Sequence, residues 1–362
     1  MKKLNLLGLS AICLLGVSGL VGCNSTESNV INIQFVPSND ASTLAALSKR
    51  LEPVLEKICP DYQFKITTGT SYAATTEALL SDQVDVGFLT ASGYAQATIQ
   101  NPGKIEVKLT SVRKGYKVQV EDYKDDVENQ IKAMNGEISG YEYLGQQSEQ
   151  DVNWYTSQLC VTNANYVDKN SDGKIDIKDM AGLKIGRMGA TSGAGYLRPL
   201  KYLNDNGMEM VDTITDATKQ IQGVQQNSYG DAFNNMQSGT IDGFWGFTDV
   251  RYAQGYTKSD SAYYQLATSF TLSKCVAITD GIYNDTISVR SNLTDAKKEA
   301  VVKAFKTAIK DTNKIDDGAT ESLSPAEILY KVYSHTGYTD AKDSDFDGER
   351  EFYNYCVAND LI

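Results

Sequence analysis

Residues 30–40 read Val30-Ile31-Asn32-Ile33-Gln34-Phe35-Val36-Pro37-Ser38-Asn39-Asp40, an alternating apolar run that ends in turn-forming residues. The alternation predicts a strand, and the helical spacing of apolar residues in 41–58 predicts a helix directly after it. The same order of strand and helix recurs at 62–80 and 84–94. Three strand-to-helix turns in succession predict an α/β fold with a parallel sheet. In such sheets ligands bind beyond the carboxyl ends of the strands.

A later strand-to-helix turn is rich in glycine and hydroxyl groups. It reads Gly189-Ala190-Thr191-Ser192-Gly193-Ala194-Gly195-Tyr196 and stands between a strand-like run, 183–186, and a helix-like run, 197–203. The first N–H groups of a helix have no partner within it, so this turn is a candidate anion site. It lacks the Lys of a GxxxxGK[ST] loop and the spacing of GxGxxG, which argues against nucleotide-binding loops of those kinds. The alternative is an ordinary turn without a ligand.

The first 22 residues have the pattern of an export signal, with Lys2 and Lys3 before an apolar run at 4–20. They end in Leu20-Val21-Gly22-Cys23, which resembles the lipobox of bacterial lipoproteins. We therefore expect residues 1–22 to be removed, Cys23 to carry lipid, and residues 23–29 to form a polar tether. A plain transmembrane anchor is disfavoured because the apolar run is short and interrupted by Ser and Gly.

The chain is acidic, with 34 Lys and Arg against 46 Asp and Glu and a formal charge of −12, which becomes −14 once Lys2 and Lys3 leave with the signal. No basic stripe is available to neutralise phosphates, so we expect no nucleic-acid partner. An anionic ligand must then be held by local dipoles. The single His, His335, has no evident Ser or Cys partner and is expected to be structural, so nothing in the sequence requires catalysis.

Four cysteines remain after the signal and Cys23 are set aside: Cys59, Cys160, Cys275 and Cys356. Export permits disulfides, and four cysteines allow three full pairings. We favour Cys160 with Cys275, because each lies in a strand-like run in the middle of the chain.

Residues 168–179 have the spacing of a calcium loop, with oxygen-bearing residues and a glycine for the sharp bend. The pattern is that of an EF-hand loop in its dockerin-like form, and the upstream run 159–162 is strand-like, so a full helix–loop–helix is not expected. The alternative is an acidic surface turn that caps a helix at Ile177. A second acidic run, 343–348, is expected to cap the last helix. The candidate Ca²⁺ ligands are Asp168, Asn170, Asp172, Lys174, Asp176 and Asp179.

Several motifs, in a fixed order along nearly all of the mature chain, resemble those of the phosphate/phosphite/phosphonate-binding proteins of ABC importers. The Gly189–Tyr196 turn resembles that family's Ser-Thr-Ser-Gly anion loop. The others are Phe35-Val36-Pro37-Ser38, Thr70-Ser71-Tyr72 before a short helix, the run 84–89 ending near Tyr94, Gly239-Thr240-Ile241-Asp242-Gly243, and Asn284-Asp285-Thr286-Ile287-Ser288-Val289-Arg290.

The resemblance implies a type II periplasmic-binding-protein fold, with two α/β lobes, a ligand cleft between them and crossing hinge strands. We expect lobe 1 to comprise 30–155 with 288–362 and lobe 2 to comprise 156–287, with 116–150 as an insertion near the cleft mouth. The implied function is a lipid-anchored, extracytoplasmic binding component, not an enzyme, that delivers a small oxyanion to an ABC permease and ATPase.

The resemblance also implies the ligand-binding residues. Asp285 would accept a hydrogen bond from a protonated ligand oxygen or contact a ligand amine. Tyr229 stands where the family tends to have a His, which leaves phosphonate, phosphite and phosphate open. A sensor subunit for a kinase is one alternative, and a calcium-dependent surface hydrolase or scaffold is another. The remaining expected contacts are Ser38, Tyr72 and Tyr94 from lobe 1, and Thr191, Ser192, Gly193 and Ala194 from lobe 2.

Overall fold

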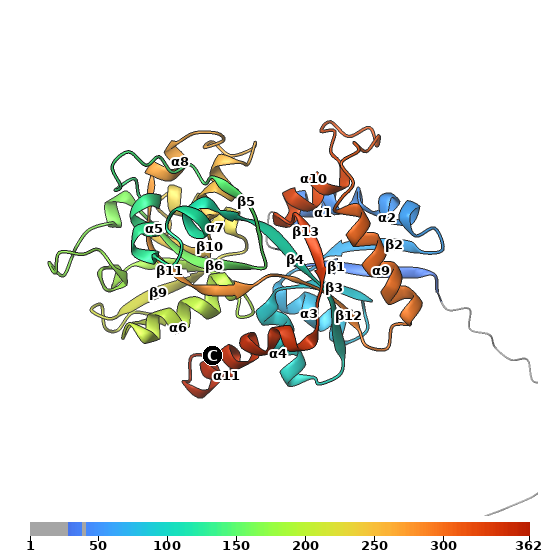
Figure 1. The fold of residues 1–362 in the computed structure, drawn as a ribbon. Helices are drawn as coiled ribbons and strands as arrows, with labels where there is room; N and C mark the ends of the chain where they lie inside the picture. The colour runs from blue at the N-terminus through green and yellow to red at the C-terminus, as the bar shows by residue number, and fades with distance from the viewer. Residues whose placement is uncertain (1–27, 38–40) are drawn as a thin grey trace, which may run out of the picture.

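A computed structural model describes residues 28–37 and 41–362. The signal, Cys23 and Ser38 lie outside these residues. Two α/β lobes lie side by side, each built on its own sheet (Figure 1). The predicted fold class, two lobes with crossing strands, is confirmed.

The sheet of the first lobe has seven strands. β1 pairs in parallel with β2 and β3, as the three strand-to-helix turns predict, whereas the later strands join antiparallel. The strand order is β13 (Gly337–Asp340), β4 (Ile105–Tyr116), β12 (Thr286–Arg290), β3 (Val86–Leu89), β1 (Val30–Phe35) and β2 (Gln63–Thr68), with β5 (Gln147–Val152) on β4.

Helices cover both faces of this sheet. The helix expected at 41–58 is in fact two, because the chain turns at Arg50 and Leu51 and Pro53 then stands in the first turn of the second helix. Phe88 packs against Phe35 and Phe305, with ring centroids 4.3 and 5.0 Å apart, and these rings form the centre of one core. That face is covered by α1 (Ala41–Lys49), α2 (Glu52–Ile58), α9 (Asp295–Ala308) and α10 (Pro325–Tyr333), and the other by α3 (Tyr72–Leu80) and α4 (Ala91–Gln100).

The sheet of the second lobe has six strands and a core around the fully buried Trp245. β8, β9, β7 and β10 are parallel, and β6 and β11 add antiparallel strands. The order is β11 (Ser273–Tyr283), β6 (Trp154–Thr162), β10 (Gly243–Phe247), β7 (Lys184–Arg187), β9 (Gln220–Gln225) and β8 (Glu209–Val211). The helices are α6 (Arg198–Asp205), α7 (Tyr229–Gln237) and α8 (Thr268–Thr271).

The segment 116–150, which we expected to belong with lobe 1, packs mainly on lobe 2. It contains η1 (Val118–Asp122) and α5 (Val127–Met134), and α5 lies against β11. Its apolar side chains share a core with Phe270, Cys275 and Ile278. Sequence adjacency to β4 suggested the wrong lobe, because the apolar face of α5 is satisfied only by the second sheet.

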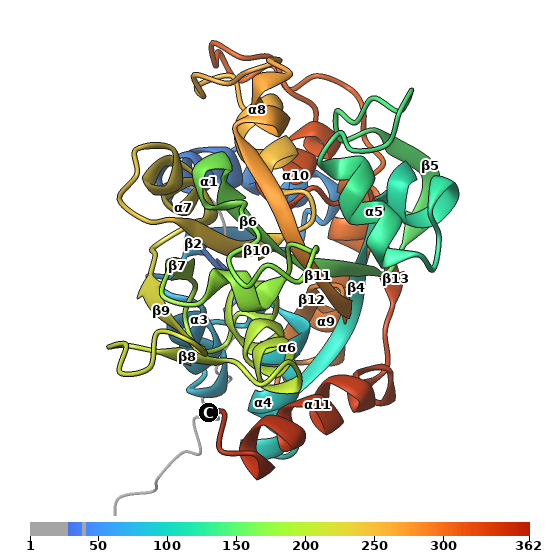
Figure 2. The same cartoon turned by 90° about the vertical axis from the view of Figure 1, so that its left-hand side faces the viewer.

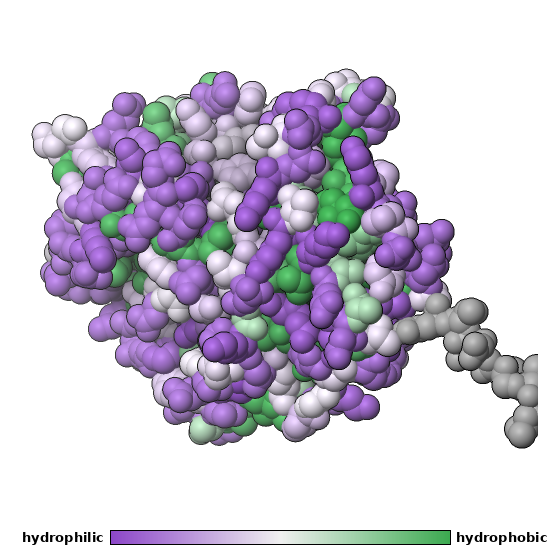
Figure 3. Space-filling model, turned by 45° about the vertical axis from the view of Figure 1, so that its right-hand side comes forward, coloured by the Kyte–Doolittle hydropathy of each residue, from purple (hydrophilic) through white to green (hydrophobic). Residues whose placement is uncertain are grey.

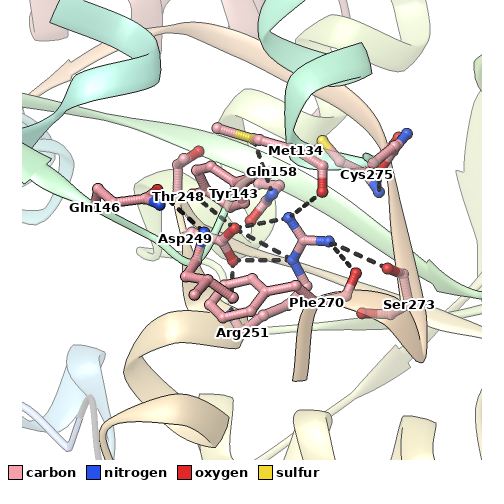
Figure 4. A network of polar contacts seen from close by, with 12 residues as sticks. Met134, Tyr143, Gln146, Gln158, Thr248, Asp249, Arg251, Phe270, Ser273 and Cys275 are labelled. Atoms are coloured by element: carbon pink, nitrogen blue, oxygen red, sulfur yellow. Dashed lines mark hydrogen bonds and ion pairs between the residues drawn. The ribbon is translucent and has the colours of Figure 1, made fainter. Parts of the chain in front are cut away.

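A buried ion pair holds this segment in place (Figure 4). Arg251 and Asp249 are both fully buried, with Nη2 and Oδ2 2.8 Å apart. Arg251 also donates to the carbonyls of Met134, at 3.3 Å, and Ser273, at 3.1 Å. The hydroxyl of Tyr143 donates to Asp249 at 3.0 Å. Burial of a guanidinium is strongly unfavourable in free energy unless its N–H groups are hydrogen-bonded. Because Arg251 bonds to both the insertion and the second sheet, this network fixes the insertion to the sheet.

The last helix, α11 (Asp347–Ala358), lies along one edge of the molecule (Figure 2) and runs from below α4 of the first lobe toward α6 of the second (Figure 1). It packs on α4 of the first lobe, and its Phe352 and Cys356 contact Leu197 of the second. Glu349, 5% exposed, pairs with Arg198 of the second lobe and accepts a hydrogen bond from Ser92 of the first at 3.0 Å. A single buried carboxylate thus links the two lobes.

The four cysteines outside the signal region are buried and free, so the predicted disulfide is wrong. Cys160 and Cys275 do stand opposite each other on β6 and β11. A bulge follows Cys275, however, and its thiol is directed to the carbonyl of Ala277 at 3.7 Å. Burial raises the pKa of the Cys275 thiol to about 12, which leaves it uncharged and unreactive.

The surface is mostly hydrophilic on the face shown in Figure 3, with apolar side chains in small groups. Large exposed apolar residues, such as Val127, Leu266 and Val357, come from separate elements. Within 28–37 and 41–362, no helix combines the length and apolar character needed to cross a bilayer.

Candidate ligand-binding cleft

A cleft of about 460 Å³ lies between the two lobes, with lining residues from both. Its walls include side chains from β4, β6, β10, α10 and the helix starts of α3 and α7. Four of the predicted ligand contacts line it: Tyr72, Ser192, Tyr229 and Asp285. A second cavity, of about 840 Å³, is bordered by Tyr72 as well and includes Thr191.

The predicted anion turn forms as expected after β7. Ser192 caps the short helix η4 (Gly193–Leu197), and its Oγ accepts the N–H of Gly195 at 3.2 Å. The same Oγ shares a hydrogen bond with the hydroxyl of Tyr229 at 3.1 Å. Ser192 is therefore held in place by two partners, and Tyr229 is coupled to the turn.

The first lobe covers part of this turn. The hydroxyl of Thr90 donates to the carbonyl of Thr191 at 3.1 Å. A Cβ on Gly193 would lie only 3.0 Å from Oγ of Ser92, so glycine permits the close approach of the two lobes there. Gly193 and Ala194 are buried beneath this contact and are not among the cleft-lining residues.

The starts of two longer helices face the same region. Ser71 caps α3 by accepting the N–H of Ala74 at 3.0 Å, and Ser228 caps α7 by accepting that of Asp231 at 3.0 Å. Tyr72 and Tyr229 are the first residues of these helices. Helix starts carry partial positive charge and unpaired N–H groups, so both lobes offer a favourable potential to an anion.

The most buried charges of the cleft form an ion pair, and we did not foresee its cationic member. Arg113 on β4 is ion-paired with Asp285, and the two side chains are 17% and 15% exposed. The guanidinium also lies 4.9 Å from the ring centroid of Tyr155. Asp285 was expected to accept a hydrogen bond from a protonated ligand oxygen or to contact a ligand amine. Its carboxylate is ion-paired with Arg113, and both side chains line the same cleft as Ser192.

His335 lies behind this pair rather than in an unrelated core. Its Nδ1 shares a hydrogen bond with the hydroxyl of Tyr338 at 3.0 Å, and its Nε2 is 3.5 Å from Oδ2 of Asp285. Burial lowers the pKa of His335 to about 4, so the ring is neutral at neutral pH. Burial alone would raise the pKa of Asp285, but Arg113 and His335 hold it below its usual range. The carboxylate is therefore ionised.

The tyrosines of the cleft are hydrogen-bond donors. Burial raises the pKa of Tyr229 to about 12 and raises that of Tyr72, Tyr155 and Tyr333 well above the usual value. A neutral phenol can donate to an oxyanion, which a phenolate cannot. The inner cleft thus combines neutral hydroxyls, helix starts and the Arg113–Asp285 ion pair.

Tyr94 does not belong to this cleft. It is fully buried in the first lobe, where its ring packs on Phe346 with centroids 4.9 Å apart. Its hydroxyl donates to Asp343 at 2.7 Å. The helix start that carries Tyr94 is near the cleft, but one turn into α4 the side chain points to the C-terminal segment instead.

The loop 168–179 uses its carboxylates as caps. Asp179 Oδ1 accepts the N–H of Lys169 at 2.8 Å and Oδ2 that of Asp176 at 2.9 Å, while Asp176 caps the short helix η3 (Ile177–Met180). Asp168 Oδ2 accepts the N–H of Gly173 at 2.9 Å. In the part of the chain that the structure describes, no three His, Cys, Asp or Glu side chains converge as a metal site.

A family model described as ABC transporter, phosphonate, periplasmic substrate-binding protein matches residues 33–346. The chain belongs to this family. The resemblance inferred from the motifs is thereby confirmed, and with it the assignment as a substrate-binding component of an ABC transporter, which binds its substrate and is not an enzyme. The kinase-sensor and hydrolase or scaffold alternatives are not favoured. No curated protein sequence matches the chain.

Several solved structures share the fold at low identity. A binding protein component of an ABC phosphonate transporter from Pseudomonas aeruginosa has a TM-score of 0.62 at 15% identity, over 91% of this chain and 87% of that one. A Prochlorococcus marinus protein in complex with methylphosphonate has 0.61 at 12%, over 91% and 98%. A Xanthomonas citri protein bound to ATP has 0.58 at 12%, over 91% and 99%.

Proposed function

We propose that this binding protein captures a small phosphorus oxyanion, a phosphonate, phosphite or phosphate, by closure of the two lobes. The observation that carries this proposal is the meeting of the Ser192 turn, the starts of α3 and α7 and the Arg113 guanidinium around one cleft. Three tetrahedral oxygens can then receive hydrogen bonds from both lobes at once.

Closure follows from where the donors lie. Ser192 and Tyr229 belong to the second lobe, whereas Tyr72 and Arg113 come from the first. An oxyanion that accepts hydrogen bonds from the donors of both lobes binds the closed protein more tightly than the open one. Binding therefore shifts the population toward the closed conformation. Thr90 and Ser92 would meet the Ser192 turn each time the lobes close. The phosphoryl groups of methylphosphonate and ATP in the similar structures support the choice of anion.

Titration calorimetry on residues 24–362 with methylphosphonate, phosphite and phosphate tests this proposal. We expect at least one of them to bind at micromolar or tighter concentration and Ser192→Leu to abolish binding. Ser238→Leu, on an exposed residue of the same lobe, is the matched control. Unchanged affinity in Ser192→Leu would refute the site, and absence of binding by all three anions would refute the ligand class. Mass spectrometry of ligand released on denaturation would name the natural anion.

We also propose that Cys23 carries the lipid that holds the protein at the outer face of the cell membrane, where it serves the permease and ATPase. Support comes from the Leu20-Val21-Gly22-Cys23 sequence and the polar residues after it. Detergent phase partitioning of the expressed full chain tests this. Wild type should enter the detergent phase and Cys23→Ser should not, and equal partitioning would contradict lipidation.

A structural Ca²⁺ ion in the loop 168–179 is a further proposal. The order of oxygen ligands supports it, and an Asp that accepts one N–H keeps other lone pairs for a cation. Calorimetry with CaCl₂ and melting with and without chelator test it, using Asp168→Ala and, as control, Asp345→Ala from the other acidic run. A melting temperature that chelator leaves unchanged would exclude the ion.

A further inference from the structure

The cleft is larger than a small oxyanion requires. Its volume is about 460 Å³. A five-atom oxyanion displaces roughly 100 Å³, on the scale of about 30 Å³ for one water molecule. Clefts of roughly 300–1,000 Å³ usually hold organic molecules of drug size. Most of this cleft therefore remains after the anion is seated at the Ser192 turn.

The remaining space has aromatic walls from both lobes. Tyr229 packs edge-to-face on Phe247, with centroids 5.0 Å apart, near the anion turn. Toward the mouth, Tyr252 packs edge-to-face on Tyr116 at 6.0 Å. The other aromatic residues that line the cleft are Tyr72, Trp154, Tyr155, Tyr330 and Tyr333. These side chains give the cleft a wall that is largely aromatic.

Tyr252 stands where the two lobes meet at the mouth. It begins η5 (Tyr252–Tyr256) in the second lobe, and it lines the cleft together with Tyr330, on α10 of the first. Tyr330 is further held by Gln147, at 3.2 Å. Burial raises the pKa of Tyr252 to about 12, so its ring is neutral. Neither ring adds a negative charge that would repel an anionic ligand.

The charged groups of the cleft are one largely buried pair and several more exposed side chains. The inner end holds the Arg113–Asp285 pair, which is neutral as a unit. The remaining charged lining residues are half-buried or exposed: Lys114, Lys258, Asp260, Glu321 and Lys331. The aromatic part of the lining therefore suits an uncharged, planar group.

Resting on the proposed oxyanion function, we infer that the ligand carries a planar aromatic or heteroaromatic group attached to its phosphorus oxyanion, held between the tyrosines at the cleft mouth. The anion occupies the Ser192 turn and the ring extends toward Tyr252 and Tyr330. The substrate class is then an aryl or heteroaryl phosphonate or phosphate ester rather than the bare ion.

Methylphosphonate and phenylphosphonate test this inference, because they share a head group and differ only in the ring. By calorimetry we expect phenylphosphonate to bind wild type at least about tenfold more tightly, from burial of one ring against aromatic faces. Tyr252→Ala should reduce that preference to under about threefold and leave methylphosphonate affinity within about twofold. Tyr252→Phe, which keeps the ring but loses the hydroxyl, should retain the preference. Tyr264→Ala, on a tyrosine 41% exposed and outside the cleft, is the control.

The outcomes separate the two proposals. If methylphosphonate binds and phenylphosphonate binds no better, the inference fails and the oxyanion function stands. If neither binds, both fail. If Tyr252→Ala weakens both ligands equally, Tyr252 acts through lobe closure and the ring site is wrong. The comparison on wild type decides the question even if Tyr252→Ala does not fold.

Discussion

Replacing Arg113 by Met should weaken both ligand binding and folding, because the substitution leaves Asp285 ionised in a largely buried place. Breaking a buried ion pair by removing one partner costs about 3–5 kcal/mol. Since the two side chains keep 17% and 15% exposure, we expect the lower end, about 3 kcal/mol, in the free energy of unfolding. Loss of one charge-assisted hydrogen bond to the anion, about 1.5–3 kcal/mol, should weaken affinity roughly 10- to 100-fold.

The partner substitution separates these two effects. Asp285→Asn removes the negative charge but leaves Arg113 stacked on Tyr155. Anion affinity should therefore stay equal or rise. The double variant should be more stable than the sum of the single costs predicts, by about 1.5 kcal/mol or more, yet should still bind weakly because the cation is absent.

Urea unfolding and calorimetry of methylphosphonate binding, on wild type and the three variants, provide the measurements. Lys201→Met is the control, since its ion pair with Asp205 lies on α6 outside the cleft. The reasoning is refuted if Arg113→Met binds within about twofold of wild type. It is also refuted if Asp285→Asn binds more weakly than Arg113→Met, which would return Asp285 to direct contact with the ligand.

Three further predictions concern the same framework. His335, with a pKa of about 4 when folded and about 6.5 when unfolded, takes up its proton only in the unfolded chain as pH falls between these values. A pKa difference of about 2.5 units, at about 1.36 kcal/mol per unit, predicts that the free energy of unfolding falls by about 3 kcal/mol by pH 4. His335→Gln should abolish this pH-dependent loss of stability. Urea unfolding of both proteins at about pH 7, 5.5 and 4.5 checks this, and identical pH profiles for wild type and variant would contradict it. Glu349→Gln should lower the free energy of unfolding by about 2–4 kcal/mol because Arg198 loses its buried partner, and a cost no larger than that of Lys201→Met would show that the link between lobes contributes little. Thiol titration of residues 24–362 without reductant should detect no reactive thiol when folded and four when denatured, whereas two would restore the Cys160–Cys275 bridge.

The sequence predicted the parts of the fold that depend on local patterns. Apolar alternation placed β1, β2 and β3 and the helices after them, and hydroxyls before helix starts placed the Ser192 turn. These features are readable because periodicity and capping act over a few residues. The lobe on which a helix packs can depend on residues far along the chain. The helix α5 follows β4 of the first lobe in sequence but packs on β11 of the second, so sequence order predicted the wrong lobe for it.

Side-chain direction was the least predictable property. Tyr72 and Tyr94 each follow a strand-to-helix turn, but Tyr72 lines the cleft and Tyr94 bonds to Asp343, 249 residues away. Nothing within a few residues of Tyr94 shows that the C-terminal segment will cover it.

The sequence by itself determined an α/β chain with a glycine- and hydroxyl-rich turn, because strand and helix periods and caps are properties of neighbouring residues. The two lobes and the binding role were implied by the resemblance of its ordered motifs to a known family. Only the tertiary structure decided the charge of the site. Arg113 and Asp285 are 172 residues apart and meet where β4 passes between the lobes, with His335 behind them. Folding brings these groups together through packing over long separations, and the same packing sets the aromatic walls and volume of the cleft.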